Sequence, residues 1–215
     1  MTRFHFLLIL MLGLCLCACT EDSRWNVRWW SSEIRERIAP KPTLVLQPFE
    51  GFPESDIQYL VQRMKVDYTG AVEVRKAIPL PEKYFHVPRQ RYNAKSLLDF
   101  LKGRAVKGEL LIGLTHRKMG YTKSATQFLY GIMGLSTIPS DACIVSSNLI
   151  YKHGVKQDHL YKVVMHEVGH SNGLKHCPVK TCYLRDAKGG NPLREETGFC
   201  ASCKRSMNDK GWRFP

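Results

Sequence analysis

Three histidines and one glutamate stand at spacings that suit a zinc ion. They lie in the stretch HEVGHSNGLKH as His166, Glu167, His170 and His176. On a helix, His166 and His170 fall one turn apart on the same face, so both imidazoles can reach one ion. Gly173 can adopt the left-handed conformation that ends a helix and turns the chain back, which delivers His176. Three imidazoles leave the fourth tetrahedral position open, which is typical of a catalytic zinc site.

Glu167 has the chemistry of a general base beside such an ion. It follows His166 directly, is not needed as a ligand, and can reach a water at the open position. A carboxylate placed in this way takes a proton from the attacking water and passes it to the leaving amine of a peptide bond. One alternative is an ordinary helix with surface histidines. Another is a non-enzymatic zinc module whose surface binds a partner, but such a module would have no need of Glu167.

Four cysteines follow the third histidine. They are Cys177, Cys182, Cys200 and Cys203, and their spacing fits a closed structural zinc site made of four thiolates. Two disulfides are the alternative, because thiols outside the cytoplasm tend to oxidise. Cys143 is left over in either case, and we expect it to be a small core residue.

The run from His166 to Cys203 resembles the archaemetzincins, whose pattern is HExxHxxGxxHC, four residues, CxM, seventeen residues and CxxC. Two departures are present: Leu184 stands in place of the family's Met, and fifteen residues separate Leu184 from Cys200. Leu is close to Met in volume, so a hydrophobic floor beneath the zinc should be kept. The shorter loop costs little closure entropy. A less specific resemblance continues upstream to about Thr43.

This resemblance implies a zinc metallopeptidase that cleaves peptide or protein substrates and holds two zinc ions, one catalytic and one structural. It implies a two-lobed, metzincin-like fold. In metzincins, an antiparallel strand at the edge of the sheet lies above the cleft and binds an extended peptide through main-chain hydrogen bonds. The stretch 142–147 has the placement of that strand, so we expect Ser146, Ser147 and Asn148 to face the cleft and contact the substrate.

Apolar periodicity predicts alternating strands and helices in the rest of the chain. The expected strands are 43–49, 71–78, 109–115, 125–130 and 142–147, and the expected helices are 56–68 and 93–102, followed by the zinc-motif helix at about 157–172. Asp56 and Asp158 are expected to cap two of these helices. The order predicts an α/β (α+β) fold with a mixed, mostly parallel twisted sheet. A small Cys-rich subdomain should follow at about 177–203.

The first residues predict export. Arg3 precedes an apolar run at 6–18 that is too short to span a membrane and suits a signal peptide. The sequence LCAC resembles a bacterial lipobox, which implies cleavage before Cys19 and lipidation of that residue. Thr20 stands where Asp would favour retention in the inner membrane, so we expect the outer membrane in a double-membraned bacterium. A plain secretory signal or an uncleaved anchor is the alternative.

These signals divide the chain into a signal peptide (1–18), a lipid-anchored tether (19–42) and a metallopeptidase domain (43–215). A chain of 215 residues with 44% hydrophobic content suits one folded domain. The formal net charge is +13, but the basic residues are scattered, which favours a solvated basic surface over a nucleic-acid site. The export signal also argues against nucleic acid as a partner. We expect a membrane-anchored, extracytoplasmic monomer.

Overall fold

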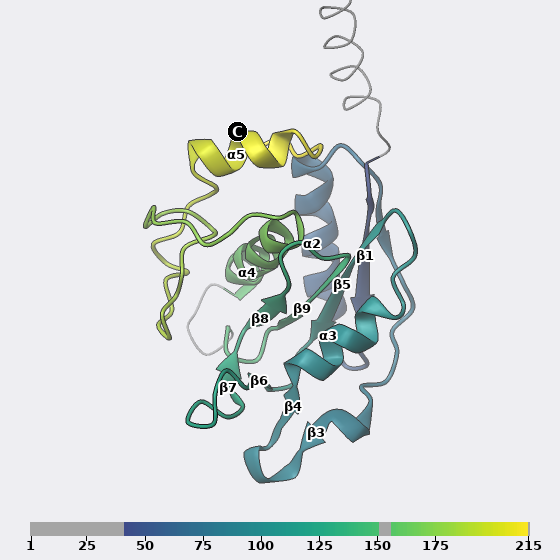
Figure 1. The fold of residues 1–215 in the computed structure, drawn as a ribbon. Helices are drawn as coiled ribbons and strands as arrows, with labels where there is room; N and C mark the ends of the chain where they lie inside the picture. Colours follow the sequence, from purple (N-terminus) through teal and green to yellow (C-terminus); the bar gives the residue numbers. More distant parts are fainter. Residues whose placement is uncertain (1–40, 151–155, 215) are drawn as a thin grey trace, which may run out of the picture. The chain divides into compact units, whose positions relative to one another are not determined.

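A five-stranded sheet forms the centre of the fold in the computed structural model, which describes residues 41–150 and 156–214 (Figure 1). The strands are β1 (Thr43–Pro48), β2 (Val72–Val74), β5 (Glu109–Thr115), β8 (Gly134–Ser136) and β9 (Ala142–Ser146). Their order is β2-β1-β5-β9-β8, and all neighbours are parallel except β8, which is antiparallel to β9. The predicted mixed, mostly parallel sheet is confirmed. The predicted signal peptide and Cys19 lie outside the described residues.

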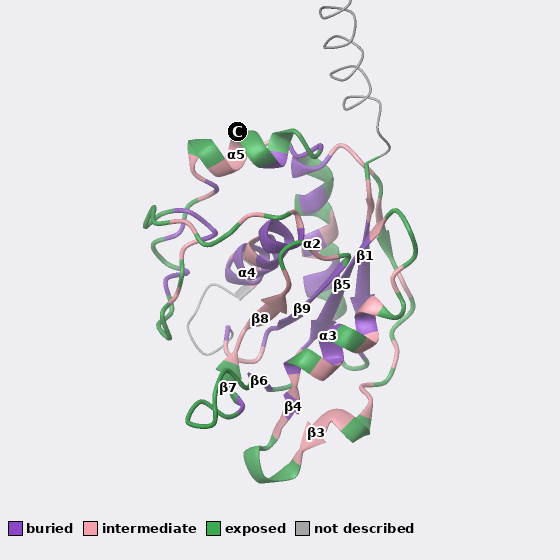
Figure 2. Ribbon diagram, in the orientation of Figure 1, coloured by how far each residue is buried: buried purple, intermediate pink, exposed green. Residues whose placement is uncertain are grey.

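Helices cover both faces of this sheet. α2 (Glu54–Asp67) and α4 (Lys156–Ser171) pack on one face, and α3 (Ala94–Lys102) packs on the other. The alternation in β1 explains the two layers, because Leu44 and Leu46 join the hydrophobic cluster of α2 and α4 while Val45 joins that of α3. Figure 2 shows β1, β5, β9 and most of α4 as buried. The zinc-motif helix is therefore anchored in the core.

A smaller, four-stranded sheet is built from two strands that precede β5 in the sequence and two that follow it. Its strands, in spatial order, are β3 (Phe85–His86), β4 (Arg91–Asn93), β6 (Met119–Tyr121) and β7 (Tyr130–Ile132). Short 3-10 turns at Glu82–Tyr84 and Val87–Arg89 flank β3, and α5 (Ala201–Asn208) lies near the end of the chain. No helix within residues 41–150 and 156–214 is long and apolar enough to span a bilayer.

The predicted strand at 125–130 is wrong. Most of these residues form the turn that joins β6 to β7. The Gln127 N–H donates to the Ser124 hydroxyl (3.2 Å), and the Leu129 N–H donates to the Thr122 hydroxyl (3.1 Å). Ser and Thr side chains offer the backbone such local hydrogen bonds, which compete with strand pairing and favour a turn.

The predicted edge strand is also in the wrong place. β9, which corresponds to the stretch 142–147, lies between β5 and β8 and is not at the edge. All five of its residues are buried, which is the pattern of an inner strand covered on both faces. The antiparallel edge strand is β8, only three residues long.

Both predicted aspartate caps lie inside their helices. α2 begins at Glu54, so Asp56 falls in its first turn. α4 already includes residue 156, so Asp158 falls in its first turn, where its carboxylate pairs with the Lys162 ammonium (2.9 Å). Carboxylates in a first turn still stabilise a helix, because they face the positive end of its dipole.

Candidate zinc centre and substrate cleft

The structure brings the three predicted histidines together. His166 and His170 lie near the C-terminal end of α4, and Gly173 (φ 93°) ends the helix as predicted, with its N–H donating to the His170 carbonyl (2.9 Å). The chain then returns and places His176 beside the other two. One ligand nitrogen from each ring lies within 4.8 Å of the others, and the Nε2 atoms of His166 and His170 are 3.0 Å apart.

Main-chain carbonyls hold the two helical imidazoles in the orientation that a metal needs. The Nδ1 atom of His166 donates to the Tyr183 carbonyl (2.6 Å), and that of His170 donates to the Leu174 carbonyl (2.8 Å). A carbonyl only accepts, so Nδ1 carries the proton and Nε2 keeps its lone pair. Burial, and then the proximity of His170, lower the pKa of His166 to about 4, and burial also lowers the pKa of His170. Both rings are therefore neutral at pH 7, which is the form that binds zinc.

His176 is held more loosely than the other two histidines. Its side chain is half-exposed, and its Nδ1 atom lies 3.9 Å from a carboxylate oxygen of Asp186. The backbone N–H of Lys188 donates to Asp186 (2.9 Å), and this hydrogen bond is the main reason that the pKa of Asp186 is lowered. Asp186 is thus a carboxylate that faces His176, a partner that the motif did not predict.

Glu167 is buried beneath the edge strand β8. A Cβ atom added to Gly134 of β8 would lie 2.6 Å from the Cγ atom of Glu167, so only glycine fits above this side chain. Burial raises the pKa of Glu167 to about 8, and a divalent cation held by neighbouring imidazoles would oppose that shift. The carboxyl group lines the same cleft as the three histidines.

Leu184 lies in the predicted position beside the zinc-motif helix. It is fully buried, and a Cβ atom added to Gly169 of α4 would lie 2.8 Å from its Cδ2 atom. This close contact explains why a glycine stands inside the helix, at a cost of about 1 kcal/mol in helix propensity relative to alanine. The preceding residue, Tyr183, supplies the carbonyl that orients His166. Leu184 therefore packs against the zinc-motif helix at Gly169, the residue before His170.

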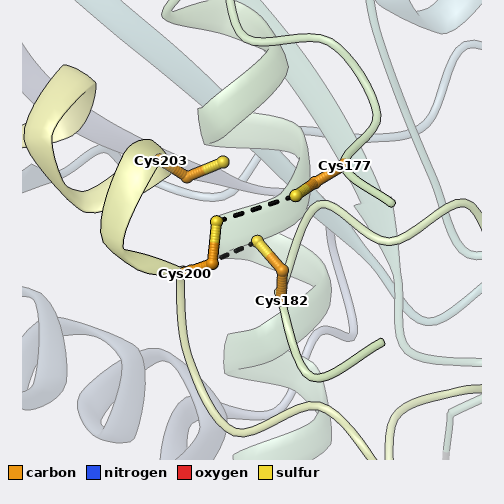
Figure 3. A group of neighbouring side chains, drawn as sticks. All are labelled: Cys177, Cys182, Cys200 and Cys203. Carbon is orange, nitrogen blue, oxygen red and sulfur yellow. Dashed lines mark hydrogen bonds between the residues drawn. The ribbon is translucent and has the colours of Figure 1, made fainter. Parts of the chain in front are cut away.

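The four predicted cysteines also form one cluster (Figure 3). The sulfur atoms of Cys177, Cys182, Cys200 and Cys203 all lie within 4.8 Å of one another, and none forms a disulfide. The Cys177 and Cys200 sulfurs are 3.7 Å apart. Four thiolates at about 2.3 Å from a tetrahedral ion would be separated by about 3.8 Å, whereas a disulfide requires about 2.05 Å. The Cys200 N–H donates to the Cys182 sulfur (3.4 Å), as expected around a thiolate.

A cleft of about 780 Å³ joins the histidines to the edge of the sheet. One wall is the segment 130–136, which carries β7 and β8, and the other contains the end of α4 and the loop 185–193. Ser146, Ser147 and Asn148 are not among the residues that line it. Ser146 and Ser147 are buried, and the Ser146 hydroxyl donates to the Arg117 carbonyl (2.7 Å). The prediction that these three residues face the cleft is therefore wrong, because β9 is an inner strand and β8 lies between it and the edge of the sheet.

A family of known peptidases matches most of the chain. The model of peptidase family M54 matches residues 47–209. The chain belongs to peptidase family M54. Among M54 relatives, the archaemetzincin of Methanopyrus kandleri is 28% identical over 141 residues, which cover 64% of this chain and 78% of the relative. The archaemetzincin of Halobacterium salinarum (strain R1) is 25% identical over 172 residues, which cover 72% of this chain and 96% of the relative.

Solved archaemetzincin structures share the fold of this M54 peptidase. The crystal structure of the M. kandleri archaemetzincin has a TM-score of 0.66 at 25% identity, covering 79% of this chain and 95% of that one. The structure of the Archaeoglobus fulgidus archaemetzincin, complexed with malonate, has a TM-score of 0.64 at 20% identity, covering 76% and 99%. The predicted family is confirmed, and the protein is a zinc metallopeptidase.

Proposed function

We propose that this M54 peptidase hydrolyses peptide bonds with zinc held by His166, His170 and His176 and with Glu167 as the general base. The observation that carries the proposal is the convergence of the three imidazoles beside the buried Glu167. Two of the rings are neutral and fixed by carbonyls, so their free nitrogens fit a divalent ion. A purely structural site would have no use for a carboxyl group in the same cleft.

The chain's own contribution to the reaction is proton transfer and positioning. A bound zinc ion would polarise the scissile carbonyl and lower the pKa of the attacking water toward about 7. Glu167 accepts one proton from that water as the water oxygen bonds to the carbonyl carbon. Glu167 then gives the proton to the amide nitrogen as the C–N bond breaks, which leaves a carboxylic acid and a free amine.

The substrate is proposed to bind as an extended strand along β8. β8 pairs with β9 on one side only, and within the described residues no strand covers its other edge. The exposed edge of a sheet binds an extended peptide through main-chain hydrogen bonds. Gly134 of β8 lies over Glu167, so a peptide on this edge passes directly by the general base.

The four cysteines are proposed to hold a second, structural zinc ion. Their sulfur spacing suits a tetrahedral ion, and all four positions are taken by protein ligands, as in sites that stabilise a fold. Export and lipidation at Cys19 are proposed from the lipobox alone. Together these features describe a membrane-anchored, extracytoplasmic peptidase, at the outer membrane if the source has one.

Two substitutions in the zinc motif test the mechanism. Glu167→Gln removes the base but no ligand, so zinc content and folding should stay the same while cleavage of any accepted peptide falls by about 10²- to 10⁴-fold. His170→Ala removes a ligand, so the zinc of this site should be lost or loosened. The measurements are zinc content by elemental analysis and the turnover of a broad peptide library.

Other outcomes would separate the competing functions. A wild-type protein that holds its zinc but cuts no peptide in the library would favour a binding module. A Glu167→Gln protein that cuts as fast as wild type would refute the role given to this residue.

A further inference from the structure

A nearly buried carboxyl group outside the zinc motif lines the cleft. Glu196 is only 3% exposed, yet it lines the cleft together with Lys162 and the three histidines. Among residues 41–150 and 156–214, no side chain donates a hydrogen bond to it and no cation lies within 4.0 Å of its oxygens. A nearly buried carboxyl group without a partner is costly to the fold, so its retention calls for a reason.

The cations nearest to Glu196 already have partners. Lys162 donates to the Leu193 carbonyl (2.9 Å) and pairs with the Asp158 carboxylate (2.9 Å). Arg185 pairs with the exposed Glu195 (2.6 Å). Each of these two cations is therefore neutralised by another carboxylate. Among the described residues, Glu196 is therefore left without an ion-pair partner, in a protein whose formal net charge is +13.

The position of Glu196 places that charge close to the bond that is cut. Lys162 precedes His166 by one helical turn, which is about 6 Å along α4. Glu196 lies near enough to Lys162 for the ammonium charge to lower its pKa, and both side chains line the cleft. An extended peptide advances about 3.3 Å per residue, so the rise from His166 to Lys162 corresponds to about two residues of a bound peptide.

We propose that Glu196 recognises a positively charged group of the substrate within one or two residues of the scissile bond. The inference rests on the proposed peptidase function and names the class of peptide that the cleft accepts. An ammonium or guanidinium group would supply the partner that Glu196 lacks. The group can be a Lys or Arg side chain or the free amino terminus of a peptide, and the experiment separates these sources.

Burial supports this assignment. It raises the pKa of Glu196 to about 7, against the opposing effects of Lys162 and Arg185. A bound cation would favour the ionised carboxylate again, so binding of the basic group and ionisation of Glu196 reinforce each other.

Peptide binding to the zinc-loaded, full-length chain tests the inference without cleavage. All proteins carry Glu167→Gln, and calorimetry measures the affinity of acetylated, amidated hexapeptides of Ala and Gly in which one position at a time is lysine or norleucine. At one position, lysine should bind at least about tenfold more tightly than norleucine. Glu196→Gln should remove this difference, whereas the control Glu73→Gln, an exposed carboxylate on β2 at the far edge of the sheet, should keep it.

Free amino-terminal versions of the norleucine peptides form the second arm. If these peptides bind more tightly than their acetylated forms, and Glu196→Gln removes that difference in affinity, the site recognises the terminal ammonium of the peptide. Equal affinity for all the peptides, or a preference that survives Glu196→Gln, would overturn the inference. Failure of the peptidase function itself would be recognised separately, as an absence of cleavage by the protein with Glu167 intact.

Discussion

Main-chain atoms, and not side chains, orient two of the three histidines that are proposed to bind zinc. His166 and His170 donate to the carbonyls of Tyr183 and Leu174, so substitutions at those two positions that preserve the backbone should preserve the rings. His176 has only Asp186 at 3.9 Å and is half-exposed. Of the three imidazoles, that of His176 is therefore the least constrained by neighbouring groups, and its position depends mainly on the path of the backbone.

The charge of Glu196 predicts a pH-dependent preference among substrates. Its pKa is raised to about 7, while Lys162 and Arg185 stay paired with Asp158 and Glu195. Glu196 is thus mostly protonated at pH 6 and mostly ionised at pH 8. The ratio of kcat/KM for a lysine peptide to that for its norleucine analogue should rise about five- to tenfold over this range. Protein groups whose titration changes the cleavage of both peptides equally do not affect this ratio.

Two results would contradict this prediction. One is a ratio that stays flat between pH 6 and pH 8 in the wild type. The other is an equal rise in the Glu196→Gln protein, because a glutamine side chain does not titrate in this range.

The residues that could be predicted from the sequence are those with a local pattern. The HExxH spacing places two ligands on one helical face whatever surrounds the helix, and the clustered cysteines have a spacing that suits one metal. Glu196 and Gly134 carry no such pattern. The role inferred for each depends on burial against segments that are distant in the sequence, which only the folded chain shows.

At the scale of elements, β8 is the part of the fold that most directly positions the chemistry. Gly134→Ala should push the Glu167 carboxyl group out of place, because the new methyl group would overlap its side chain. A displacement of about 1 Å at a reacting group can cost on the order of 10²-fold in rate. We expect kcat to fall by about that factor, with zinc content unchanged, in steady-state assays on a cleaved peptide.

Gly198→Ala is the matched control for this substitution. A Cβ atom there meets nothing within 4 Å, so activity should stay within about twofold of wild type. Full activity in the Gly134→Ala protein would show that the close approach of β8 to Glu167 has no role in catalysis.

β8 could not be predicted from the sequence, because it is too short to show a pattern. Its three residues, Gly134–Ser136, contain no alternation, and its position depends on pairing with β9. The buried strands were easier to predict: the expected strand at 109–115 matches β5 at both ends. The expected zinc-motif helix differs from α4 by one residue at each end. A long apolar pattern is a stronger signal than a short polar edge.

At the scale of the whole molecule, the two metal sites predict two zinc ions per chain. Native mass spectrometry of the purified protein should show both, and the thiols of the Cys-rich cluster should react with an alkylating reagent only after a chelator has removed the metal. One zinc per chain, with four thiols that stay unreactive until a reductant is added, would instead establish the disulfide alternative.

Membrane attachment is a prediction about the other end of the chain. Cys19→Ser removes the thiol that the lipobox would modify, so the protein should leave the membrane fraction or remain unprocessed. Cell fractionation with immunoblotting measures both outcomes. A Cys19→Ser protein of mature size that still sediments with membranes would refute the lipobox interpretation.

His176 and Cys177 are neighbours in the chain, so one peptide bond links the two metal sites. The Cys177 N–H donates to the Leu184 carbonyl (2.8 Å), and the carbonyl just before Leu184 holds His166. The helix alone brings His166 and His170 together, whereas the position of His176 is tied to that of the neighbouring Cys177. Loss of the cysteine cluster should therefore displace His176 before it disturbs the two helical imidazoles.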